Sequence, residues 1–262
     1  MNATQNEENV TPTPQEPTEI KVPIRTYLHP DTGSRITYVS TIHAAQPAHY
    51  TALAKIIEAV ETKGGTIYYE RVTHPGPEEL AAAPEHLRWG AEAIKKKLDF
   101  GTKYAADAGL VLQKHELPQR EGWQNHDLTT LQAAEIYGDE ELRRQDDQRQ
   151  QTEYFLSNMT ADLRSAMMLQ TLAASVKFIT GEASIEEVLP KAEREMAAAR
   201  EAIVLTALDQ QLTDTPGHSF ALVWGAGHLP SYADALTERG YKEEGEHWIT
   251  AIDTRAGQPP EA

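Results

Sequence analysis

The chain has 262 residues, no cysteine, and a net charge of −16 that arises from 40 acidic and 24 basic residues. The lack of cysteine excludes disulfides, thiolate metal ligands and thiol nucleophiles. The negative charge disfavours binding to nucleic acid or to a membrane surface, and we expect neither as a partner. No apolar run approaches the ~18 residues of a membrane span and no secretory signal is visible, so we expect a soluble cytoplasmic protein.

The length suffices for one sizeable hydrophobic core, and we predict a single domain over residues 20–254. Residues 1–19 and 255–262 are polar and proline-containing, with few apolar side chains. Such segments bury too little apolar surface to offset the conformational entropy lost on ordering, so we predict disordered tails at both positions.

The first predicted elements form a βαβ unit. A strand is expected over 35–42, followed by a helix that starts near Pro47. The apolar stripe of this helix consists of Leu53, Ile56, Ile57 and Val60. A second β-branched and aromatic strand, 66–69, follows Gly64-Gly65 and ends at Glu70. We expect these two strands to pair in parallel, side by side, through a right-handed crossover.

The remaining chain reads as helices between further strands. We predict a helical region over 77–106, a short strand over 110–113, a helical insertion over 128–212 with helices near 131–155, 160–179 and 185–212, a strand over 219–224, a helix over 232–239 and a strand over 241–252. The predicted fold class is therefore α/β, with a mixed sheet core, βαβ units and a helical insertion of about three helices.

Histidines follow two of the predicted strands. The apolar strand 220–224 breaks at Gly225 and Gly227 and leads to His228, while the strand 35–42 leads to His43. Glycines allow a tight turn or a close backbone approach at such a place. Side chains just past the carboxyl ends of strands lie where open α/β sheets bind ligands, so these residues form a candidate site.

Two imidazoles and one carboxylate can ligate a divalent metal ion. His43, Glu70 and His228 are the candidate ligands, with Mn²⁺, Co²⁺ or Zn²⁺ as the ion and an open position for a water molecule. The alternative is that each of these residues is a hydrogen-bonded side chain at a strand end.

Arg200 falls on the apolar stripe of a predicted helix, together with Met196, Val204 and Leu208. A buried arginine requires a carboxylate or an oxyanion, and Glu70 is the expected partner. Alternatively, the stem of Arg200 packs and its head reaches solvent. His74, His126 and Asp127 lie in predicted loops and could line a cleft.

The paired histidines, Glu70 and Arg200 together resemble the TraB/GumN/Tiki superfamily, which has distant erythromycin-esterase-like and ChaN-like relatives. The resemblance extends from about Tyr38 to Ile252. Gly225 to His228 matches the second Gly-x-x-His motif of that superfamily. The first motif is matched at His43, but Ser40 stands where the family has Gly. Arg200 is followed by Glu201, where the family usually has Asn.

The resemblance implies a metal-dependent hydrolase of peptidase type, in which His43, Glu70 and His228 hold the ion or its water. Arg200 would polarise the substrate or orient Glu70. The alternative is a non-catalytic protein that binds a peptide or small ligand in the same cleft. A third possibility is that the amphipathic surface of the insertion 128–212 mediates self-association, so a homo-oligomer is a possible partner arrangement.

Overall fold

The computed structural model describes residues 19–180, 184, 187 and 189–254. The predicted tail residues 1–18 and 255–262 lie outside this described part. Glu19, which the sequence assigned to the tail, is the first residue of strand β1 (Glu19–Leu28).

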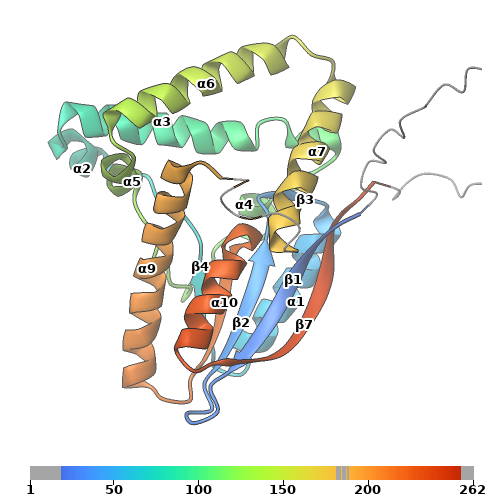
Figure 1. Cartoon of the computed structure of the whole chain (residues 1–262), viewed down its shortest axis with the longest axis vertical. Helices are drawn as coiled ribbons and strands as arrows, with labels where there is room; N and C mark the ends of the chain where they lie inside the picture. Colours follow the sequence, from blue (N-terminus) through green and yellow to red (C-terminus); the bar gives the residue numbers. More distant parts are fainter. Residues whose placement is uncertain (1–18, 181–183, 185–186, 188, 255–262) are drawn as a thin grey trace, which may run out of the picture.

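A five-stranded mixed sheet forms the centre of the fold, in the order β4-β6-β2-β1-β7 (Figure 1). Its other strands are β2 (Arg35–Thr41), β4 (Thr66–Tyr69), β6 (Ser219–Gly225) and β7 (Lys242–Asp253). Strands β4, β6 and β2 are parallel to one another, whereas β1 pairs antiparallel with both β2 and β7. The predicted α/β class with a mixed sheet is confirmed.

The predicted direct pairing of the first two strands is wrong, because β6 lies between them. Leu222 of β6 is opposite Tyr38 of β2 on one side and Tyr68 of β4 on the other. Residues 220–224 are fully buried. A strand that is apolar on both faces takes the central position of a parallel group, where both faces are covered.

Strand β1 was not predicted, since Pro23 interrupts its alternating apolar residues and a proline removes a ladder hydrogen bond. The structure accommodates Pro23 because the ladder between β1 and β2 begins only at the next residue, with Ile24 opposite Val39. No N–H is therefore required from Pro23 toward β2.

The described helices are α1 (Pro47–Glu61), α2 (Pro77–Ala82), α3 (Glu85–Gly101), α4 (Gln113–Glu116), α5 (Thr130–Tyr137), α6 (Asp139–Ser157), α7 (Ala161–Ile179), α9 (Lys191–Asp214) and α10 (Leu229–Glu238), with short 3₁₀ turns η1 (Ala105–Ala108) and η2 (Ala226–His228). The predicted strand near 110–113 is reduced to β5 (Val111–Leu112), which pairs with β3 (Ala44–Ala45) in a separate two-stranded sheet.

The helical insertion differs from its prediction in two places. The first predicted helix is two helices, α5 and α6, because Gly138 adopts a φ of 74° between them, a conformation that favours glycine. The helix predicted over 185–212 begins at Lys191, directly after Pro190. Residues 185, 186 and 188 of that prediction lie outside the described residues.

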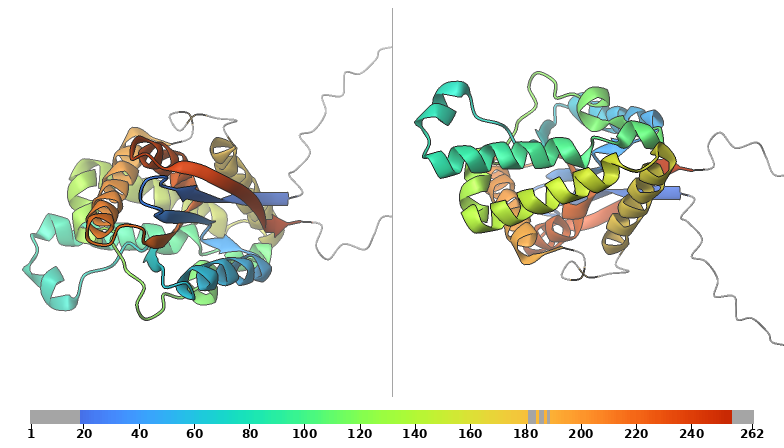
Figure 2. Two further views of the ribbon diagram at one scale, coloured as in Figure 1. Left: turned by 90° about the horizontal axis from the view of Figure 1, so that it is seen from below. Right: turned by 90° about the horizontal axis from the view of Figure 1, so that it is seen from above.

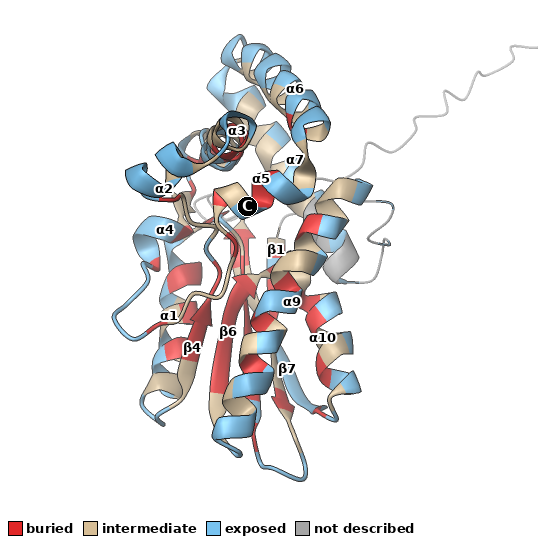
Figure 3. Ribbon diagram, turned by 90° about the vertical axis from the view of Figure 1, so that its left-hand side faces the viewer, coloured by how far each residue is buried: buried red, intermediate tan, exposed pale blue. Residues whose placement is uncertain are grey.

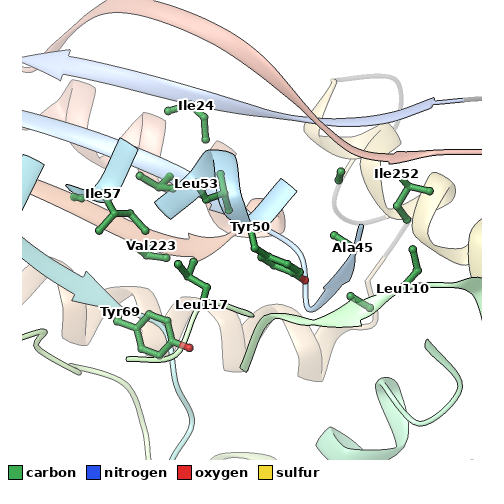
Figure 4. Packing of buried hydrophobic residues seen from close by; sticks show 14 of the residues in the cluster. Ile24, Ala45, Tyr50, Leu53, Ile57, Tyr69, Leu110, Leu117, Val223 and Ile252 are labelled. Carbon is green, nitrogen blue, oxygen red and sulfur yellow. The ribbon is translucent and has the colours of Figure 1, made fainter. Parts of the chain in front are cut away.

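Helices cover both faces of the sheet (Figures 2 and 3). On one face, Leu53 and Ile57 of α1 pack with Val223 of β6 and Ile24 of β1 (Figure 4). On the other face, the cluster contains Val204 and Leu208 of α9, Leu236 of α10 and the β6 residues Phe220, Leu222 and Trp224. Both faces of the parallel strands are thus buried.

Helices α3, α5 and α6 lie beyond the carboxyl ends of the parallel strands (Figures 1 and 3). Helix α9 joins the two regions: Met196 packs in a separate cluster with residues of α3, α5 and α6, whereas Val204 and Leu208 pack on the sheet. Arg200 is midway between these contacts, so the fold carries it to the end of the sheet. Among the described residues, no helix has the length and apolarity needed to cross a membrane.

Gly90 of α3 provides a test of how the insertion packs. A Cβ at Gly90 would lie 2.8 Å from Ala134 Cβ and 2.9 Å from Leu142 Cδ1. We predict that Gly90→Ala lowers the free energy of unfolding by about 1–2 kcal/mol, since overpacking outweighs the roughly 1 kcal/mol that alanine contributes in a helix. Gly101→Ala, at the end of the same helix, meets nothing within 4 Å and is the matched control. Urea unfolding in which both variants are equally stable would contradict this packing.

Candidate active site

Three of the four residues predicted to carry chemistry are in direct contact at the carboxyl end of the parallel strands. Arg200 Nη2 donates to Glu70 Oε1 at 2.6 Å, and Arg200 Nη1 lies 3.3 Å from His228 Nε2. His228 Nε2 is 3.8 Å from Glu70 Oε1. Their side chains are 13% (Arg200), 6% (Glu70) and 14% (His228) exposed, so the cluster is largely buried but reaches solvent.

The strands and helices position these side chains. Glu70 follows β4, and its N–H donates to Val223 O of β6 at 3.0 Å, which continues the ladder by one residue. His228 ends the 3₁₀ turn η2 directly after β6. Arg200 approaches from α9, and its guanidinium carbon lies 5.6 Å from the centre of the Trp224 ring, within the range of a cation–π contact.

Gly225 lies in close contact with Glu70 and His228. Its φ of −53° is available to any residue, but a Cβ there would lie 3.1 Å from Glu70 Oε2 and 3.6 Å from His228 Cδ2. The Gly225 N–H donates to Glu70 Oε2 at 2.5 Å. Of the two uses expected of these glycines, a tight turn or a close backbone approach, Gly225 makes the close approach, while Gly227 lies within the η2 turn.

Asp127 is the second carboxylate that binds Arg200. Its Oδ1 accepts from Arg200 Nε at 2.8 Å and its Oδ2 from Nη2 at 2.6 Å, which is a bidentate contact. The Asp127 side chain is 0% exposed. A charge-assisted pair of this geometry fixes the plane of the guanidinium. The sequence indicated Asp127 only as a loop residue that could line a cleft, because no periodic pattern relates a loop to a helix 73 positions away.

Glu201 is a third buried carboxylate, placed behind His228. Its Oε1 lies 2.6 Å from His228 Nδ1, and its Oε2 accepts from the Ser231 hydroxyl at 2.5 Å. In the sequence, Glu201 stands out only as a departure from a family motif. Its spacing of three and seven residues from Val204 and Leu208 puts it on the buried face of α9 and is the signal that could have revealed it.

His43 is exposed and lies two residues beyond the end of β2. Thr41 of β2 is opposite Gly225 of β6, so His43 and His228 follow neighbouring strand ends. His43 Nδ1 lies 3.2 Å from Gln113 Oε1. His43 acts electrostatically on Glu70, since it is among the groups that lower the pKa of that carboxyl.

The charges at the site determine the ionisation of Glu70. Burial would raise the pKa of this carboxyl, but Arg200, followed by His228 and His43, outweighs it and lowers the pKa to about 2. Burial opposes the charge on Arg200, whereas Glu70 and Asp127 favour it, and the pKa of the guanidinium is raised. Both groups are therefore charged at neutral pH.

Two features favour binding of a cation at this site. One guanidinium and three carboxylates leave two excess negative charges when both imidazoles are neutral. In addition, His43 and His228 each place Nδ1 near an oxygen acceptor. An Nδ1–H held in this way leaves the lone pair on Nε2, as is usual for metal-binding histidines.

The arrangement does not, however, offer three ligands to a metal ion. Both oxygens of Glu70 accept hydrogen bonds, from Arg200 and Gly225, and Arg200 Nη1 also lies close to His228 Nε2. Within the described part of the chain, no group of three His, Asp or Glu side chains is spaced to hold a metal. The side chains as they stand do not fit the predicted ion, and His43, Glu70 and His228 as its ligands remain a prediction.

The remaining candidate histidines have partners away from this cluster. His74 Nδ1 lies 3.0 Å from Thr130 Oγ1, and His74 Nε2 lies 3.2 Å from Glu92 Oε1. The His126 ring packs against Tyr68 at a tilt of 59°, with ring centres 4.5 Å apart, and burial lowers the pKa of His126. We assign neither residue a role in the site.

Comparison with known proteins returned no match among protein-family models, curated proteins or solved structures. The resemblance to the TraB/GumN/Tiki superfamily therefore remains a prediction that rests on the motifs.

The pKa of Glu70 predicts a pH dependence of stability. Because the folded pKa is depressed to about 2 from the ordinary value of 4.5, ionised Glu70 stabilises the fold above pH 4.5, and this contribution is lost as the pH falls toward 2. Its size is about 3 kcal/mol. At pH 3 most of the unfolded chains but few of the folded ones have Glu70 protonated, so we expect the stability difference between wild type and Glu70→Gln to narrow by about 2 kcal/mol between pH 6 and pH 3 in urea unfolding.

The matched control is Glu135→Gln, at an exposed position of α5. Its stability difference from wild type should stay within about 0.5 kcal/mol at each pH. If the stability difference between wild type and Glu70→Gln were equally independent of pH over this range, the result would contradict the buried ion pair.

Proposed function

We propose that this chain is a hydrolase of a peptide or amide bond, with its catalytic centre at Glu70, Arg200 and His228. The observation that carries the proposal is the meeting of these three groups, with Arg200 Nη1 3.3 Å from His228 Nε2 and Arg200 Nη2 2.6 Å from Glu70 Oε1. They combine a base, a cation and a carboxylate within hydrogen-bond reach, at a sheet end where α/β folds bind ligands.

Each group has a role in this proposal. His228 Nε2 accepts a proton from the attacking water and transfers it to the leaving amine as the bond to the carbonyl carbon breaks. Arg200 stabilises the negative charge that develops on the carbonyl oxygen. Glu70 and Asp127 keep the guanidinium charged and oriented. His43, which is exposed two residues beyond β2, contacts the substrate or its water.

A divalent metal ion, Mn²⁺, Co²⁺ or Zn²⁺, belongs to the proposal through the motif resemblance. His43, Glu70 and His228 would be its ligands only if Glu70 and His228 gave up their present contacts with Arg200 and Gly225, and none of the roles above depends on the ion. With both imidazoles neutral, the three carboxylates and the one guanidinium of the cluster leave two excess negative charges, which supports binding of a cation.

The proposed partner is a peptide or small-molecule substrate, and we propose no role for nucleic acid. The acidic composition, with a net charge of −16, supports this choice. A cytoplasmic location and a homo-oligomeric state remain proposals from sequence.

The second candidate function is binding of a peptide or small ligand without turnover. It is favoured by one observation: the charged groups of the site already satisfy one another, since Asp127 and Glu70 both bind Arg200. Ion-pair networks of this kind also occur in proteins for structural reasons alone.

Activity separates the two functions. The full chain should hydrolyse members of a peptide library in the presence of Mn²⁺, Co²⁺ or Zn²⁺. His228→Ala should lower kcat/KM at least ~100-fold, the size typical of losing a general base. His247→Ala, at an exposed position of β7, is the matched control and should retain full activity. Hydrolysis that is unaffected by His228→Ala would contradict the assignment of this site, and binding without hydrolysis would favour the second function.

Metal content tests the role of the ion separately. We expect the metal-loaded full chain to retain about one ion per chain by elemental analysis, and His43→Ala with His228→Ala to retain none. Hydrolysis that persists after exhaustive chelation would contradict the metal requirement while leaving the roles of Arg200 and His228 intact.

A further inference from the structure

Glu201 is buried behind His228 and contacts it directly. Its side chain is 9% exposed, and its Oε1 lies 2.6 Å from His228 Nδ1. Its second oxygen accepts a hydrogen bond from Ser231, on the first turn of α10, at 2.5 Å. Both carboxylate oxygens are thus engaged, and the carboxylate is held between two helices, α9 and α10.

This contact determines where the imidazole carries its proton. An ionised carboxylate only accepts hydrogen bonds, so His228 must donate from Nδ1. In the neutral ring the lone pair is then on Nε2. His228 Nε2 lies 3.3 Å from Arg200 Nη1 and 3.8 Å from Glu70 Oε1, so the lone pair faces the centre of the candidate site.

We propose that Glu201 is a positioning residue for His228: it fixes the Nδ1–H tautomer and the ring orientation that direct the Nε2 lone pair toward the centre of the candidate site, where Arg200 Nη1 also lies. Ser231 fixes the carboxylate in turn. This inference rests on the proposed hydrolase function for its catalytic consequence, but the tautomer itself can be measured without any activity.

The position of Glu201 in the fold explains why it acts on His228. Residues 200 and 201 are consecutive on α9, and both side chains reach the carboxyl end of β6. Arg200 thereby contacts Nε2 while Glu201 contacts Nδ1 of the same ring. One turn of α9 consequently binds both nitrogens of His228, and the edge of that ring packs near Trp224, with ring centres 6.1 Å apart.

The direct test is nitrogen NMR of the histidine rings in the full chain, after chelator treatment and at a pH near 8.5. The His228 signals are identified by their loss in His228→Gln. We expect the Nδ1–H tautomer of His228 in wild type and in Glu201→Gln, whose amide oxygen still accepts. Glu201→Leu should shift His228 toward the Nε2–H tautomer, and His247, which is exposed on β7, should be unchanged. An Nε2–H tautomer of His228 in wild type would overturn the proposal, even if Glu201→Leu does not fold.

The catalytic consequence is tested on the substrate found for the wild type. Glu201→Leu should lower kcat by roughly 10–100-fold with little change in KM, the range found for residues that orient an active-site group, and Glu201→Gln should restore most of it. An unchanged kcat in Glu201→Leu would overturn the positioning role. If wild type hydrolyses no peptide, the proposed function fails, whereas the tautomer measurement still decides what Glu201 does to His228.

Discussion

The structure depends on the burial of one guanidinium between two carboxylates. Arg200 on α9 binds Glu70 at the end of β4 and Asp127 in the loop that precedes α5, and these three residues come from distant parts of the chain. Removing Arg200 would leave two buried carboxylates without their partner, and breaking a buried ion pair in this way typically costs about 3–5 kcal/mol. The pair therefore restrains how the helical insertion sits on the sheet, and the candidate site is formed by the same contact.

This constraint also explains the local chemistry. The guanidinium keeps Glu70 ionised in a buried position, with its pKa at about 2, and Gly225 lets that carboxylate approach the β6 backbone. His228 is held from both sides by consecutive residues of α9, Arg200 at Nε2 and Glu201 at Nδ1. A charged, largely buried and fully hydrogen-bonded cluster requires little reorganisation to act, which is the property that electrostatic catalysis exploits.

Much of this arrangement could be predicted from the sequence, because periodicity reports which residues are buried. Both members of the Arg200–Glu70 ion pair were indicated in this way: Arg200 by its place on the apolar stripe of a helix, and Glu70 by its place at the end of a predicted strand. Strand order could not be predicted: β6 lies between β2 and β4 through pairings across more than 150 positions. The contact of Asp127 with Arg200 could not be predicted either, since the sequence of a loop has no periodic pattern that shows which helix it contacts. Strand β1 was not predicted because Pro23 argues against a strand. The structure accommodates this proline because the pairing of β1 with β2 begins one residue later, at Ile24.

The measurement that tests the central contact most directly is a double-mutant cycle on Glu70 and Arg200, with Glu70→Gln, Arg200→Met and the double variant unfolded in urea at pH 7. Because the two side chains are in contact and largely buried, we predict that the double variant is more stable than the sum of the single losses implies, by about 2 kcal/mol or more. Losses that add to within about 0.5 kcal/mol would show that the two residues are energetically independent and would contradict the account.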